Sequence, residues 1–188
     1  LLKDLQMPGS QAFFDDATST ASFLVWDRET KAAAVIDAVL DFDSATGKLS
    51  TTSADRMLAR TREQGLGVVW VLETHAHAAH LSAADYIRRK TGARVGIGAR
   101  ITEVQTRFRA LFGAPEAETE ASVFDALFED GEVFRIGGIE ARVLHTPGHT
   151  PACVTYVIND AAFVGDTLFM PDYGTARADF PGGDATAL

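Results

Sequence analysis

The five histidines of this sequence are the residues best suited to chemistry, and they form two short groups. His75, His77 and His80 lie close together, and His145 and His149 follow about seventy residues later. Neutral imidazole is a frequent ligand of first-row divalent metals, so this clustering indicates a metal site. The competing interpretation is a set of surface or helix-capping histidines, which the close spacing disfavours.

A third candidate ligand, Asp166, occupies the same kind of position as two of the histidines. His75, His149 and Asp166 each follow an apolar run with the character of a β-strand. The three runs cover residues 66–72, 139–144 and 161–164. Open α/β sheets place their sites beyond the carboxyl ends of strands. The sequence therefore predicts that these three segments build one site.

The elements that must position these side chains change character along the chain. Strands and helices alternate at first, and a run of short strands follows, which indicates an α/β (α+β) fold. We expect helices at residues 53–63, 80–90 and 102–112. We expect strands at residues 21–27, 32–39, 66–72, 94–97, 133–136, 139–144, 153–158 and 161–165.

Composition limits the class of protein. The chain has 188 residues, 46% of them hydrophobic, and a formal net charge of −9. This acidic balance argues against nucleic acid or an anionic membrane as a partner. No apolar stretch approaches the roughly 18 residues of a membrane span, and we expect no leader segment. The one cysteine, Cys153, excludes a disulfide framework, and its apolar surroundings are typical of a buried, inert thiol. We therefore expect a cytoplasmic protein.

Three strings of residues resemble those of a known superfamily. Residues 74–80, 146–150 and 165–166 are similar to the motifs of the metallo-β-lactamase superfamily. This resemblance implies a four-layered αβ/βα sandwich, with residues 1–188 forming a single domain whose C-terminal part is missing. A sheet face left uncovered in this way would favour a homodimer. Residues 150–156 and 174–183 resemble the persulfide (sulfur) dioxygenases, most closely the bacterial β-lactamase-like proteins of hydrogen sulfide detoxification.

The resemblance also implies a ligand set. His75, His149 and Asp166 match the residues with which persulfide dioxygenases hold one Fe(2+) per chain. His77 and His80 would then lie behind this site or belong to a vestigial second one. The superfamily has an aspartate where this chain has Ala79, which disfavours a dinuclear centre. Ala79 is consistent with an enzyme that uses one metal. The alternative is that it is a natural or engineered change that inactivates the protein.

Substrate contacts are implied for a glycine-bounded loop after Asp166. In the resembled family an arginine matching Arg177 contacts the carboxylate of the thiol substrate, and a neighbouring aspartate matching Asp179 organises the loop. A surface ion pair between Arg177 and Asp179 is the alternative. Tyr173 would contribute its phenol to the same pocket, or would serve packing. Asp37, which comes directly after the apolar residues 34–36, would support the structure near the metal.

Three functions remain open. The first is a mononuclear iron dioxygenase that uses O2 to oxidise glutathione persulfide, or a similar small persulfide, to sulfite and thiol. Two imidazoles and one carboxylate on one face of the ion would leave positions for the persulfide sulfur and O2. The second is a Zn(2+)-dependent thioester hydrolase of the glyoxalase II type. The third is a metal-free, catalytically inactive binding or sensing module.

Overall fold

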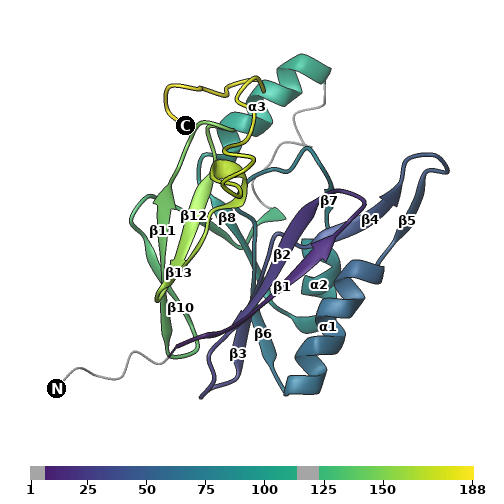
Figure 1. The fold of residues 1–188 in the computed structure, drawn as a ribbon, viewed down its shortest axis with the longest axis vertical. Helices are drawn as coiled ribbons and strands as arrows, with labels where there is room; N and C mark the ends of the chain where they lie inside the picture. Colours follow the sequence, from purple (N-terminus) through teal and green to yellow (C-terminus); the bar gives the residue numbers. More distant parts are fainter. Residues whose placement is uncertain (1–6, 114–122) are drawn as a thin grey trace.

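The computed structural model describes residues 7–113 and 123–188, which form two β-sheets packed face to face (Figure 1). The first sheet has six strands in the order β1-β2-β3-β6-β8-β9. Its strands are β1 (Gly9–Asp15), β2 (Thr20–Trp26), β3 (Ala32–Ile36), β6 (Gly67–Leu72), β8 (Arg94–Gly98) and β9 (Ala126–Phe128). Neighbouring strands from β3 to β9 pair in parallel, so their carboxyl ends meet at one edge.

The second sheet is antiparallel and has the order β10-β11-β12-β13. Its strands are β10 (Val133–Ile136), β11 (Ile139–His145), β12 (Val154–Ile158) and β13 (Ala161–Phe163), followed by the short 3-10 helix η3 (Gly165–Thr167). A small three-stranded sheet flanks the first one. It consists of β5 (Lys48–Ser50), β4 (Val39–Asp43) and β7 (Leu81–Ser82).

Two hydrophobic cores hold these layers together. One core lies between the sheets and joins Ile36 and Trp70 of the first sheet to Tyr156 of the second. The other core packs the helices α1 (Thr52–Gln64) and α2 (Ala84–Thr91) on the opposite face of the first sheet. Helix α3 (Ile101–Phe112) packs separately against the loop before β12. Strand β11 alternates buried and exposed residues, as expected for a strand with one face on the core.

The structure confirms the predicted fold class and corrects two element boundaries. The helix expected from His80 begins only at Ala84, because Leu81 and Ser82 pair with β4 instead. The Ser82 hydroxyl also accepts a hydrogen bond from the amide of Ala84 at the start of α2. The strand expected over residues 32–39 is interrupted at Asp37, whose φ of 52° lies in the left-handed region.

Further strands were not expected from the sequence. They are β1, β4, β5 and β9. The outer face of β11 carries exposed side chains, including Glu140, Arg142 and Leu144. Among the described residues, no helix is long and apolar enough to cross a membrane.

Candidate metal centre

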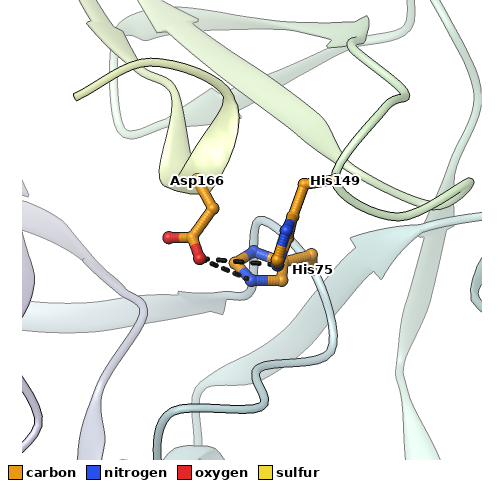
Figure 2. Close-up of side chains that lie close together, drawn as sticks. All are labelled: His75, His149 and Asp166. Carbon is orange, nitrogen blue, oxygen red and sulfur yellow. Dashed lines mark ion pairs between the residues drawn. The ribbon is translucent and has the colours of Figure 1, made fainter. Parts of the chain in front are cut away.

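The structure brings the side chains of His75, His149 and Asp166 together (Figure 2). His75 lies in the loop after β6, His149 in the loop between β11 and β12, and Asp166 in η3. The Asp166 Oδ2 atom is 3.7 Å from His75 Nε2 and 3.4 Å from His149 Nε2. Metal–ligand bonds of about 2.0–2.2 Å allow two ligands of one ion to lie up to about 4.4 Å apart. These separations therefore suit one shared cation.

The hydrogen bonds around His149 support the same conclusion. Its Nδ1 atom lies 2.7 Å from the backbone carbonyl oxygen of Arg177. Because a carbonyl oxygen can only accept, Nδ1 must carry a proton, and in the neutral ring this leaves the Nε2 lone pair on the side of the Asp166 carboxylate. His75 Nε2 is buried and has no hydrogen-bond partner among the described residues. A cation shared by these three side chains would satisfy the unpartnered His75 Nε2 atom.

The electrostatics of the pocket suit the forms in which these groups bind metals. Burial, reinforced by the neighbouring His77, lowers the pKa of His75 to about 2, so its imidazole is neutral at physiological pH. Burial raises the pKa of Asp166, although His149 partly offsets this effect. A bound divalent cation would favour the ionised carboxylate. The three residues therefore fit a divalent metal.

A second buried cluster lies beside this site and consists of Asp37, Glu73 and His77. The Nε2 atom of His77 is 3.0 Å from Asp37 Oδ1 and 3.1 Å from Glu73 Oε2. Burial opposes a charge on His77, but the Asp37 and Glu73 carboxylates outweigh it and raise its pKa to about 10. His77 is therefore the cationic partner of two buried carboxylates in this structure.

Glu73 was missed by the sequence analysis. It follows β6 directly. The other site residues were predicted because they follow strands, so the same rule could have found Glu73. Its Oε1 atom accepts a hydrogen bond from the Ser82 hydroxyl, and its burial raises its pKa despite the contact with His77. Ser82 belongs to β7, the strand that replaced the start of the expected helix.

His80 and Ala79 do not complete a second metal site with His75. The His80 Nδ1 atom lies 3.3 Å from the Thr20 hydroxyl, and burial lowers the pKa of His80 to about 4. Neither group of potential metal ligands among the described residues contains His80. Ala79 offers no ligand atom. The predicted placement of His77 and His80 behind the metal or in a vestigial site stays a prediction.

The loop with the predicted substrate residues passes beside His149. The Arg177 guanidinium donates two hydrogen bonds to the Asp179 carboxylate, one of them 2.6 Å long, and lies over the Phe180 ring at 4.9 Å. The Phe180 ring in turn meets the His149 ring edge to face at 5.1 Å. Tyr173 is 79% exposed and contacts Phe169. The substrate roles of Arg177, Asp179 and Tyr173 stay predictions.

Cys153 is buried, as expected. Its side chain is 2% exposed and its Sγ atom contacts the Thr150 hydroxyl at 3.1 Å. Burial raises the pKa of the thiol, which disfavours the reactive thiolate.

The substitution Gly165→Ala is expected to cost more stability than Gly65→Ala. Both glycines have a left-handed φ, 52° and 64°, so both alanines are strained by about 1–2 kcal/mol. A Cβ at residue 165 would also lie 2.3 Å from the Thr74 hydroxyl oxygen, whereas nothing lies within 4 Å at residue 65. Urea unfolding of both variants measures the difference. Equal losses would show that the contact with Thr74 has no energetic weight.

The metal-free protein is expected to be most stable near pH 6.5. The ordinary pKa of histidine is 6.5. As the pH decreases below this value, the unfolded chain binds protons at His75 and His80, whereas the folded chain does so only near pH 2 and 4. The free energy of unfolding therefore decreases as the pH decreases. The contribution of His77 is fully present below pH 6.5 and is lost as the pH rises through about 10. Each linked proton contributes about 1.4 kcal/mol per pH unit.

Urea unfolding in the presence of a chelator, at a series of pH values, measures this profile. The variant His80→Gln serves as the control, because it should make the acid side less steep, with His75 still contributing, and leave the alkaline side unchanged. A stability that does not vary between pH 5.5 and 9 would contradict the expected protonation states.

Comparisons with known proteins relate this geometry to a family. Residues 15–188 match the family described as the metallo-beta-lactamase superfamily (Lactamase_B). The chain is 53% identical to the "Beta-lactamase hydrolase-like protein" of Xylella fastidiosa, over 98% of this chain and 43% of that protein. It is 44% identical to "Glyoxylase B2" of Dictyostelium discoideum, over 95% of this chain and 62% of that protein.

A third relative is the mitochondrial "Persulfide dioxygenase ETHE1" of Homo sapiens, which is 30% identical over 93% of this chain and 58% of that protein. The crystal structure of ETHE1 from Myxococcus xanthus has a TM-score of 0.75 and 29% identity, and it matches 95% of this chain and 65% of that one. The chain thus spans about half to two thirds of the length of its relatives. The match over residues 15–188, together with the sandwich of sheets, shows that the chain belongs to the metallo-beta-lactamase superfamily.

Proposed function

We propose that this chain contains the centre of a mononuclear iron persulfide dioxygenase. The observation that carries the proposal is the convergence of two imidazoles and one carboxylate, from His75, His149 and Asp166, with Ala79 where a second metal would need a carboxylate. Two histidines and one carboxylate form the ligand set of non-haem Fe(II) oxygenases. The identity with a named persulfide dioxygenase supports this choice of metal and reaction.

The proposed reaction converts a small persulfide, O2 and water into thiol and sulfite. The bond between the two sulfurs breaks, the outer sulfur gives four electrons to O2, and two protons are released. Bound Fe(II) would supply the redox chemistry that zinc lacks. A reducing compartment suits a low-molecular-weight persulfide such as that of glutathione, so we propose the cytoplasm as the location.

The residues of the chain would hold the metal and orient the substrate. The carbonyl of Arg177 keeps His149 in the tautomer that binds a metal. The side chain of Arg177 is 66% exposed, and its guanidinium forms a fork that can bind a substrate carboxylate in place of Asp179. Tyr173 lies exposed in the preceding turn, where its phenol could reach the same substrate.

Anaerobic loading with Fe(II), followed by glutathione persulfide and O2, tests the proposal. We expect about one iron per chain, uptake of O2 and formation of sulfite in equal amounts. The Zn(II)-loaded protein is the control and should consume no O2. Iron-loaded protein that neither consumes O2 nor forms sulfite would refute the proposal.

A zinc-dependent thioester hydrolase of the glyoxalase II type is the second candidate. The names of two relatives, a hydrolase-like protein and a glyoxylase, favour it. This function predicts two metals per chain and turnover of S-lactoylglutathione, and Ala79 speaks against the second metal. Emission spectroscopy of the purified protein separates the candidates by metal count and identity. A protein that binds no metal would instead support the inactive binding module.

A further inference from the structure

We propose that Thr74 is a positioning residue whose hydroxyl fixes the tautomer of His75 and so directs the lone pair of His75 Nε2 to the metal. The inference rests on the metal site of the proposed function but not on the identity of the metal or the reaction. It assigns a role to Asp37 as well, because Asp37 determines what the hydroxyl of Thr74 can do.

The Asp37 carboxylate is buried in the segment between β3 and β4. It accepts hydrogen bonds from the amide of Thr74 at 2.7 Å and from the Thr74 hydroxyl at 2.8 Å. His77 Nε2 also contacts this carboxylate at 3.0 Å. Burial would raise the pKa of Asp37, but the charge and hydrogen bond of His77, together with the amide of Thr74, outweigh it and hold this pKa below its usual value. An ionised carboxylate can only accept hydrogen bonds.

The proton of the Thr74 hydroxyl is therefore committed to Asp37. His75 Nδ1 lies 3.0 Å from the same hydroxyl oxygen. Because a hydroxyl has a single proton, this oxygen can only accept from His75, and Nδ1 must carry the hydrogen. A neutral imidazole has one N–H, so Nε2 is left with a free lone pair. This Nε2 atom faces the Asp166 carboxylate, as Figure 2 shows.

The hydrogen bonds from Asp37 through Thr74 to His75 form a relay, in which Asp37 and Thr74 are both held in place. The amide of Asp37 donates to the carbonyl of Leu72, and its own carbonyl accepts from the Ser22 hydroxyl at 2.6 Å. Thr74 is 1% exposed, and Gly165 lies so close that a Cβ there would meet the hydroxyl oxygen at 2.3 Å. The hydroxyl thus has little freedom to rotate or to exchange its partners.

The other tautomer of His75 would work against metal binding. A proton on Nε2 would point at the Asp166 carboxylate, and a metal would have to displace it before binding. The relay from Asp37 removes this competing hydrogen bond. It places a negative charge behind the imidazole through one hydroxyl, much as the Arg177 carbonyl supports His149.

The first test reads the tautomer in the metal-free wild-type protein. Long-range 1H–15N correlation spectra of the histidine rings, near pH 7.5, distinguish the two neutral forms. We expect His75 to carry its proton on Nδ1, with the resonance assigned by its loss in His75→Gln. A proton on Nε2 would overturn the proposal. This reading needs neither a loaded metal nor an active enzyme.

The second test compares Thr74→Val with Thr74→Ser. Valine keeps the shape of threonine and removes the hydroxyl, whereas serine keeps the hydroxyl. We expect Thr74→Val to weaken the binding of Co(II) or Zn(II), measured by chelator competition, by about 10–100-fold. Thr74→Ser should bind close to wild type and keep the proton on Nδ1.

A purely structural role of Thr74 gives a different outcome. Thr74→Val would then lower the urea midpoint but leave the tautomer and the metal affinity unchanged, which would overturn the proposal. If Thr74→Val does not fold, the wild-type spectrum and Thr74→Ser still decide the question. The proposed dioxygenase can fail separately, because a protein that binds metal through this relay without oxidising persulfide would refute only that function.

Discussion

Replacing Asp166 with alanine is expected to reduce the metal content from one ion per chain to none. Asp166 supplies the only carboxylate of the group, and the two imidazoles that remain bring no negative charge to offset a charge of 2+. The affinity should fall by more than the 10–100-fold typical of residues that only support a ligand. O2 uptake with persulfide should vanish with the metal. Emission spectroscopy and chelator competition measure both effects.

The stability of the metal-free protein should hardly change in Asp166→Ala, because the Asp166 side chain is 35% exposed and faces acceptors without a cation. Asp172→Ala is the matched control: it removes an exposed carboxylate from the neighbouring turn and should retain the metal. If Asp166→Ala kept one ion with unchanged affinity, Asp166 would not be a ligand.

Replacing His77 with glutamine is expected to cost about 3–5 kcal/mol of stability, because two buried carboxylates lose their shared cationic partner. The side chains of His77, Asp37 and Glu73 are all less than 10% exposed. Glutamine can donate one hydrogen bond but carries no charge. Urea unfolding of the metal-free protein at pH 7 measures the loss.

The double variant Glu73→Gln, His77→Gln separates charge from shape. With one carboxylate neutralised, the loss of His77 should cost less than it does alone, so the two effects should not add. Additive effects, or a loss below about 1 kcal/mol for His77→Gln, would show that His77 is not the charged partner of Asp37 and Glu73.

The three candidate metal ligands could be predicted because each is marked by the residues next to it in the sequence. His75, His149 and Asp166 each follow an apolar strand. The strands β11 and β13 are both antiparallel to β12, so they end at the same edge of the second sheet, and the packing of the two sheets places this edge beside the end of β6. The groups that support these ligands by hydrogen bonds could not be predicted in the same way. The carbonyl of Arg177 that supports His149 is a backbone group, which no residue type identifies.

The misplaced start of α2 has a physical cause of the same kind. Residues from His80 onward suit a helix by their own sequence, but Leu81 and Ser82 pair with β4, which lies about forty residues earlier in the chain. Pairing with a strand that is remote in the sequence outweighs the local preference for a helix. The residues next to Ser82 give no sign of this pairing. The break of the strand at Asp37 likewise depends on the remote amide and hydroxyl of Thr74.

The origin of the three candidate ligands has a consequence for the whole sandwich. His75 follows a strand of the first sheet, whereas His149 and Asp166 follow strands of the second, so a bound ion would act as a cross-link between the layers. Metal at a hundred times its dissociation constant would add about 2.7 kcal/mol to the free energy of unfolding. Chelation should therefore loosen the contact between the two sheets first, and a thermal shift should report occupancy even in variants without any activity.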